Sequence, residues 1–227
     1  MWGHGSGARG ESGAIYVVTD SPTVSEKYIV DALTSRGRKA EIINISETPI
    51  HVIHGVAVIR VQNPYAAVAY ASLVEKSVNS AQSIYAALNR LSWIPKFGPP
   101  YAVVSADVAV EKVELEKPWM LLTAWRLGLD GAVTSVEGAK SVLEHRLYMR
   151  NPLAKASVLI PKPHRTVSIY ATEERAEGLA AEVLRYLGLK YARVTLGDYG
   201  GRFYVVDVDP VPPLESREEA EMLAEVL

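Results

Sequence analysis

The amino-acid sequence predicts an α/β protein with a parallel-sheet lobe at its N-terminal side and an antiparallel-sheet part after it. In the first 95 residues, short β-branched runs alternate with helix-forming segments, which is typical of a parallel sheet with crossover helices. The stretch PKFGPP at 95–100 cannot continue a helix, and it indicates a boundary between the two parts. Near the C-terminus, two apolar runs flank a glycine-rich turn, which predicts a hairpin.

The N-terminal lobe is predicted over 14–95. A helix follows the first strand, and Thr23 and Glu26 have the spacing of a capping box at its start. We expect strands at 14–19, 39–45 and 55–61, and helices at 65–77 and 80–92.

Residues 1–13 are expected to form a flexible leader. They contain a G-x-G-x-x-G pattern at Gly5, Gly7 and Gly10. A dinucleotide-binding loop must follow a strand and open a helix, whereas this pattern precedes the first strand. We therefore expect no cofactor loop there.

The second part is predicted over 96–227. Its clearest element is an amphipathic helix over 172–187, which Gly188 ends, and the last helix starts at Ser216 with Glu219 completing a capping box. The strands 191–196 and 202–208 flank a five-residue turn at 197–201. We also expect strands at 101–105, 119–125, 157–160 and 166–171, and a helix at 135–148.

Composition limits the classes of function. The 227 residues carry a net charge of −2, which does not suggest a nucleic-acid partner. The absence of cysteine excludes disulfides, thiolate metal sites and cysteine nucleophiles. No apolar run reaches the roughly 18 residues that a membrane span needs. We expect a cytoplasmic protein that has no membrane or nucleic-acid partner.

Four segments bear a resemblance to a known family. They are a strand ending in arginine (VIR, 58–60), the segment EKSVNS (75–80), the strand, glycine loop and second strand of 119–133, and the strand VVDVDP (205–210). With this order of elements, the chain resembles the ATP-grasp carboxylate–amine ligases over about 14–227. The most similar branch adds glutamate to a ribosomal protein or joins amino acids to a carrier protein in lysine biosynthesis.

The resemblance implies an ATP-grasp-like fold and a set of site residues. Nucleotide-binding positions correspond to Thr123, Gly128 and Gly131, and substrate- or anion-binding positions to Arg60, Asn79 and Arg165. Arg60 has the alternative of an ordinary surface ion pair. The metal strand of the family corresponds to Asp207 and Asp209, where Mg²⁺ would bind.

The chain departs from the family where the chemistry takes place. The family holds ATP phosphates with two lysines, but 81–91 contains only Arg90, and Thr123 takes the second position. The second family arginine corresponds to Ser168, and a substrate-binding segment is missing after Tyr170. Two lost charge-assisted contacts cost about 3–6 kcal/mol, or roughly two to four powers of ten in affinity. We therefore assign no catalytic residue and expect no bound ATP or Mg²⁺.

Asp207 and Asp209 share one face of their strand, because side chains alternate along a strand. The pair has two interpretations, a Mg²⁺ site or a polar sheet face. The five-residue turn at 197–201 places Arg193 one diagonal step from Asp207. From this register we predict that Arg193 pairs with Asp207, and with Asp209 as well, and so replaces a metal.

The leading functional prediction is a catalytically degenerate ATP-grasp-like protein that acts as a binding or regulatory module. It would pair with an active ligase or hold a nucleotide weakly. Two alternatives stay open, an active ATP-dependent carboxylate–amine ligase with a rearranged site and a small-molecule binding protein for an amino acid. The apolar stretch PYAAVAYASLV at 64–74 adds the expectation of a homo-oligomer.

Overall fold

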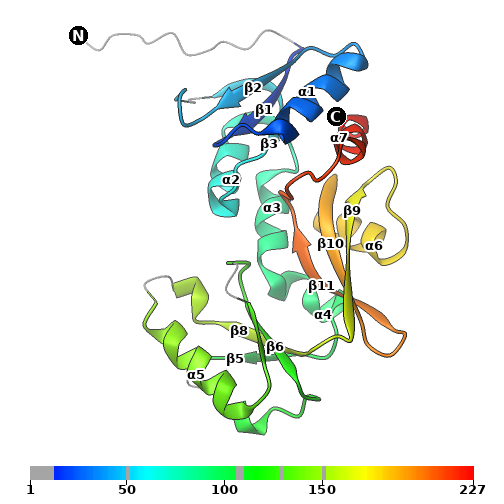
Figure 1. Cartoon of the computed structure of the whole chain (residues 1–227). Helices are drawn as coiled ribbons and strands as arrows, with labels where there is room; N and C mark the ends of the chain where they lie inside the picture. Colours follow the sequence, from blue (N-terminus) through cyan, green and yellow to red (C-terminus); the bar gives the residue numbers. More distant parts are fainter. Residues whose placement is uncertain (1–12, 50–51, 106–109, 128–129, 150–151) are drawn as a thin grey trace, which may run out of the picture. The chain divides into compact units, whose positions relative to one another are not determined.

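A computed structural model describes residues 13–49, 52–105, 110–127, 130–149 and 152–227 (Figure 1). The chain divides into two compact units. The first unit contains the residues up to Tyr85, together with Tyr170–Arg193 and Asp209–Leu227, and the second contains Ala86–Ile169 and Val194–Val208. The lobes predicted at 14–95 and 96–227 are continuous segments, whereas each unit is assembled from separate stretches. Apart from Gly13, the predicted leader lies outside the described residues.

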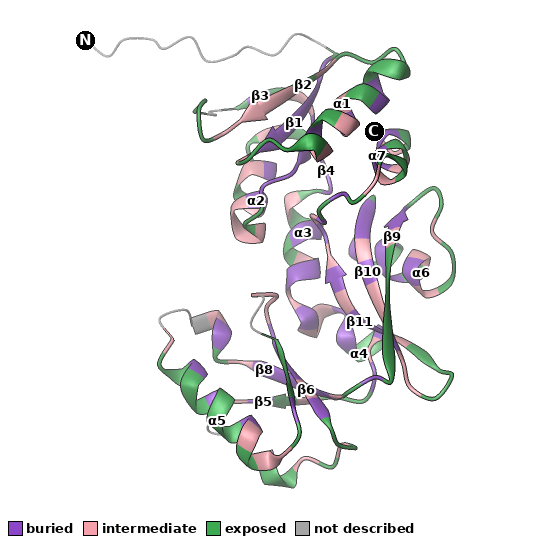
Figure 2. Cartoon of the chain, in the orientation of Figure 1, coloured by how far each residue is buried: buried purple, intermediate pink, exposed green. Residues whose placement is uncertain are grey.

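The first unit contains a four-stranded parallel sheet in the order β2-β1-β3-β4. β1 lies between two neighbours, with Ile15 opposite Ala40 of β2 and opposite Val56 of β3. All residues of β1 are buried (Figure 2), as expected for a central parallel strand that is covered on both faces. The strands are β1 (Ile15–Thr19), β2 (Ala40–Asn44), β3 (Ile53–Ile59) and β4 (Val74–Val78).

The segment after β3 differs from the predicted helix over 65–77. Helix α2 (Pro64–Ala71) ends early, and the chain then forms β4, which lies parallel to β3 with Val78 opposite Val58. The edge of β3 supplies backbone hydrogen-bonding partners that a local reading of the sequence does not include. The self-association predicted from 64–74 stays a prediction.

Three helix ends of the first unit lie at the expected residues, namely the starts of α1 and α7 and the end of α6. In helix α1 (Val24–Ser35) the capping box forms, with Thr23 N donating to Glu26 Oε2 at 2.8 Å. Helix α7 (Arg217–Glu225) begins after Ser216, whose Oγ accepts from Glu219 N at 3.2 Å. Gly188, with φ of 67°, ends α6 (Gly178–Leu187). Helix α6 starts later than predicted, because strand β9 continues to Thr172 and a turn follows.

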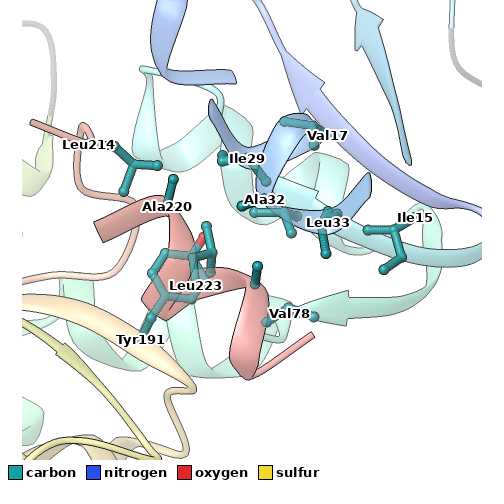
Figure 3. Packing of buried hydrophobic residues seen from close by; sticks show 12 residues of the cluster. Ile15, Val17, Ile29, Ala32, Leu33, Val78, Tyr191, Leu214, Ala220 and Leu223 are labelled. Atoms are coloured by element: carbon teal, nitrogen blue, oxygen red, sulfur yellow. The ribbon is translucent and has the colours of Figure 1, made fainter. Parts of the chain in front are cut away.

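The core of the first unit lies between the sheet and the helices α1 and α7 (Figure 3). Apolar side chains at helical spacing on α1 and α7 meet the buried side chains of β1, β3 and β4. The members that carry this packing include Val17, Val58, Ile29, Leu33, Ala220, Leu223 and Tyr191. Among the described residues, no helix combines the length and the apolar character that crossing a membrane would require.

The second unit contains a four-stranded antiparallel sheet in the order β5-β8-β6-β7. Helix α5 (Val136–Leu147) packs Ala139 and Leu143 onto Trp119, Leu121 and Leu159 of this sheet. The strands are β5 (Ala102–Val104), β6 (Trp119–Thr123), β7 (Gly131–Val133) and β8 (Ser157–Pro161). These positions agree with the predicted strands and with the predicted helix at 135–148.

The predicted helix over 80–92 is split in the structure. Helix α3 (Ala81–Leu88) ends before Asn89, whose side chain accepts a hydrogen bond from Leu91 N at 3.2 Å and caps a short 3₁₀ turn, Arg90–Ser92. Asparagine favours such caps over a helix interior, because its side chain competes for backbone hydrogen bonds. A single helical turn, α4 (Ile94–Phe97), follows.

A second antiparallel sheet has the order β11-β10-β9. Its strands are β9 (Arg165–Thr172), β10 (Tyr191–Asp198) and β11 (Phe203–Asp209). The predicted fold class, a parallel sheet followed by antiparallel sheets, is therefore confirmed.

Candidate functional site

Two short segments of the second unit pair with each other and carry the charged side chains of the site. Arg90 N donates to Ala124 O and Arg126 N donates to Leu88 O, both at 2.8 Å, in an antiparallel arrangement. In this pairing Arg90 lies opposite Ala124, and their side chains share a face. Arg126 is two residues from Ala124 in an extended segment, so it lies on the same face as Arg90. The site begins with two guanidinium groups that the backbone holds near each other.

These arginines and two aspartates form the charge cluster, which consists of Arg90, Arg126, Asp130 and Asp207. Arg90 binds Asp130 with both ends of its fork, Nη1 to Oδ1 at 3.0 Å and Nη2 to Oδ2 at 2.7 Å. Arg90 Nη2 also donates to Asp207 Oδ1 at 2.9 Å, and Arg126 Nε donates to Asp207 Oδ2 at 3.0 Å. Each carboxylate therefore has at least one charge-assisted partner.

The charge cluster reaches from the interior of the second unit to its surface. The Arg90 side chain is 2% exposed, whereas Asp130 is 25% exposed and Asp207 and Arg126 are 27% exposed. Burial acts to raise the pKa of the Asp207 carboxyl, but Arg90 and Arg126 outweigh it, so this pKa lies below its ordinary value. Asp207 is accordingly an ionised partner of two arginines.

The charge cluster should make stability depend on acid pH. The unfolded chain titrates an aspartate near about pH 3.9, and folding lowers the pKa of Asp207. Its contribution is therefore complete above about pH 4 and is lost as the pH falls through the folded-state pKa. Urea unfolding of the wild type and of Asp207→Asn between about pH 6 and about pH 3 should show a smaller loss for the variant. Equal losses would contradict the prediction.

The nucleotide-binding positions predicted from the resemblance have different surroundings. The side chain of Thr123 is fully buried, and its backbone serves the charge cluster, with Thr123 N donating to Asp130 Oδ1 at 2.9 Å and Thr123 O accepting from Arg90 at 2.8 Å. Gly131 is exposed at the start of β7, opposite Leu121. Gly128 lies outside the described residues.

The metal positions do not have the surroundings of a divalent-cation site. Both carboxylate oxygens of Asp207 are engaged by guanidinium groups. Asp209, counted in the first unit, accepts a hydrogen bond from Val211 N at 3.0 Å. Within the described part of the chain, no three His, Asp or Glu side chains gather in a way that could hold a metal. The side chains at Asp207 therefore do not fit Mg²⁺, which needs free oxygen ligands.

Arg60 lies buried just after β3 in the first unit. Its Nε is 3.5 Å from Glu26 Oε1, and both side chains are 5% exposed. The guanidinium also donates to the carbonyl oxygen of Pro212. Of the two interpretations of Arg60, the ion pair is present, and it lies in the interior rather than at the surface.

Asn79 joins three backbone segments of the first unit. Its Nδ2 donates to Tyr191 O and to Pro210 O, both at 2.8 Å, and its Oδ1 accepts from Lys190 N at 2.7 Å. The residue is 1% exposed and has a left-handed backbone with φ of 40°. Asparagine tolerates this conformation better than most residues. Its amide is thus already used by the chain itself.

Arg165 lies in β9, with its Nε donating to Asp198 Oδ2 at 2.9 Å and with 67% of its side chain exposed. A backbone hydrogen bond from Gly201 is the main cause of the lowered pKa of Asp198, and Arg165 adds to it. Arg165 is therefore a surface ion-pair partner.

The prediction that Arg193 pairs with Asp207 is wrong. Arg193 donates to the carboxylates of Glu215 and Glu219, the latter at 3.1 Å. The hairpin closes in a two-residue turn, because Gly200 and Gly201 have φ values of 70° and 91° and Tyr199 N donates to Arg202 O. The change from the predicted five-residue turn shifts the register by an odd number, which moves Arg193 to the other face.

The sequence analysis gave no role to Arg90, Arg126 or Asp130. Arg90 is the only basic residue in 81–91, and Arg126 and Asp130 flank the glycine loop. A signal was present, since Arg126 and Asp130 lie four residues apart between the segments expected at 119–125 and 135–148. Only the pairing of 88–90 with 124–126 brings them together.

Comparisons with known proteins bear on the fold. No family model and no curated protein sequence matches the chain. The RimK-domain ATP-grasp protein from Sphaerobacter thermophilus superposes with a TM-score of 0.71 at 17% identity, covering 94% of this chain and 98% of that one. The ATP-grasp ligase PsnB, with minimal precursor, Mg and ADP, gives 0.66 at 10% identity, covering 93% and 95%.

A third structure, the D-alanine–D-alanine ligase from Bacillus anthracis complexed with ATP, gives a TM-score of 0.63 at 12% identity, covering 96% of each chain. Likeness at such identities concerns the path of the chain rather than its chemistry. It agrees with the parallel sheet and the two antiparallel sheets described above. The chain therefore has the ATP-grasp fold, as its resemblance to the carboxylate–amine ligases predicted.

Proposed function

We propose that this protein is a catalytically degenerate ATP-grasp protein that acts as a binding or regulatory module. The observation that carries the proposal is the charge cluster. Asp207, which corresponds to a metal ligand of the family, is bound by Arg90 and Arg126. Phosphoryl transfer depends on positioned cations that neutralise developing charge, so a carboxylate already neutralised by the protein cannot help to hold them.

The surroundings of the lysine positions support the same proposal. Arg90 is the basic residue of the first segment, and it points its guanidinium at Asp130, Asp207 and Thr123 O. Thr123, at the second position, is fully buried and has no charge to offer a phosphate. At these two positions the chain therefore offers no free cation for the phosphate contacts that lysines make in the family.

Two alternatives each have one observation in their favour. An active carboxylate–amine ligase is favoured by the fold, because the similar structures that cover over 90% of both chains include ligase complexes with nucleotides. A small-molecule binding protein is favoured by a hollow of about 270 Å³ in the second unit. Its lining includes Lys117, Lys162 and His164, so an anionic ligand would suit it.

The test is a coupled assay for ADP release. Purified protein with Mg·ATP and a mixture of amino acids and carboxylates should release ADP at the background rate, and hydroxylamine should trap no acyl-phosphate. Asp207→Asn serves as the control, because a true ligase would lose its activity on this substitution. ADP release by the wild type that Asp207→Asn abolishes would establish the active ligase instead.

A further inference from the structure

Each oxygen of the Asp207 carboxylate already accepts a hydrogen bond from a guanidinium group. Oδ1 accepts from Arg90 Nη2 at 2.9 Å, and Oδ2 accepts from Arg126 Nε at 3.0 Å. A divalent cation of the Mg²⁺ type binds through oxygen ligands and would have to displace at least one guanidinium. It would also bring two positive charges beside the guanidinium that remained.

Arg90 is not a side chain that can swing away to make room. Its fork is closed on Asp130 at 3.0 and 2.7 Å, and the same group donates to Thr123 O at 2.8 Å. Only 2% of the side chain is exposed, and moving it away would take positive charge from both Asp130 and Asp207 and leave Thr123 O without its donor. The backbone hydrogen bond from Arg90 N to Ala124 O holds the residue from the other end.

Arg126 differs from Arg90 because it borders solvent. Its side chain is 27% exposed, as is that of Asp207. A substitution at Arg126 can therefore change the charge beside Asp207 without removing the buried Arg90 from the core. A substitution at Arg126 therefore tests the charge beside Asp207 separately from the folding of the second unit.

We propose that Arg90 and Arg126 replace the divalent cation at the acidic strand of this fold, so that Asp207 is an arginine-bound structural carboxylate and not a metal ligand. The inference rests on the proposed function, and it deepens that proposal because it states which groups supply the positive charge beside Asp207. Arginine suits the role because its planar fork binds carboxylates directionally and keeps its charge at every physiological pH.

The experiment measures binding of Mn²⁺, a stand-in for Mg²⁺, through the electron paramagnetic resonance signal of the free ion. We compare the wild type with Arg126→Glu, which puts a second carboxylate beside Asp207, and with Arg126→Lys, which keeps the positive charge. Arg126→Glu should bind Mn²⁺ at least about tenfold more tightly than the wild type, because one repulsive charge becomes an oxygen ligand. Arg126→Lys should bind no better than the wild type.

The double variant Arg126→Glu with Asp207→Asn locates the new site, and it should lose the gain. Wild-type Mn²⁺ binding that Asp207→Asn abolishes would overturn the inference, and so would a folded Arg126→Glu protein without any gain. Folding of each variant is checked by its thermal midpoint in EDTA. This measurement and the assay of ADP release can fail separately. If the protein turned over ATP but bound no Mn²⁺ at Asp207, the proposed function would be refuted and the present inference would stand.

Discussion

Replacing Arg90 with leucine is expected to lower the free energy of unfolding by about 3–5 kcal/mol, the range for removing one partner of a buried ion pair. Arg90 is 2% exposed and neutralises both Asp130 and Asp207. The substitution leaves those two carboxylates close together, with Arg126 as the remaining cation in the charge cluster. It also leaves Thr123 O without the donor at 2.8 Å. Urea denaturation followed by circular dichroism measures the change.

Arg165→Leu is the matched control for this substitution. Arg165 also makes an arginine–aspartate pair in the second unit, with Asp198 at 2.9 Å, but its side chain is 67% exposed. Surface pairs of this kind contribute about 0–1 kcal/mol, so the control should unfold close to the wild type. If the two variants lost the same stability, burial of Arg90 would not be what makes its pairs important.

Asn79→Ala is expected to cost at least about 2 kcal/mol, because it leaves two buried backbone carbonyls without this partner at about 1–3 kcal/mol each, and a part-buried N–H as well. These groups are Tyr191 O, Pro210 O and Lys190 N. They belong to two segments, 190–191 and 210, and Asn79 itself belongs to a third, so its amide holds together the three parts of the first unit. Thermal and urea unfolding of the variant measure the loss.

Asn79→Gly separates the hydrogen bonds from the backbone conformation. The φ of 40° at this position is costly for alanine and not for glycine. We therefore expect the glycine variant to be more stable than the alanine variant by about 1 kcal/mol, and both to be much less stable than the wild type. A glycine variant with wild-type stability would mean that Asn79 is there for its conformation and that its amide contributes nothing.

The elements that local sequence determines are those with a strong local signal. The capping box at Thr23, the N-cap at Ser216 and the glycine after α6 have their expected roles, because a cap depends on residues three or four apart, although the Glu219 carboxylate accepts from Glu215 N rather than from Ser216 N. β4 was not predictable in this way. Its five residues become a strand only beside the edge of β3, which is a partner distant in sequence.

The sequence predicts Asp207 and Asp209 as a pair of carboxylates and Arg193 as the partner of Asp207, whereas in the structure Arg90 and Arg126 bind Asp207. The turn between β10 and β11 decides this register, and a difference of an odd number of residues reverses the face on which Arg193 lies. Periodicity along a single strand cannot show this, because it does not contain the geometry of the turn. Asn79 is similar, since its three partners come from segments that the sequence does not place together.

The sequence by itself determined the fold class and the order of most elements, because these depend on residue type and on local periodicity. Only the tertiary structure decided which charged side chains meet at Asp207. The pairing of 88–90 with 124–126 brings Arg90 and Arg126 to Asp207, and Asp130 joins them from the far side of the glycine loop. Electrostatic energy depends on distances between side chains, and those distances exist only once the chain has folded.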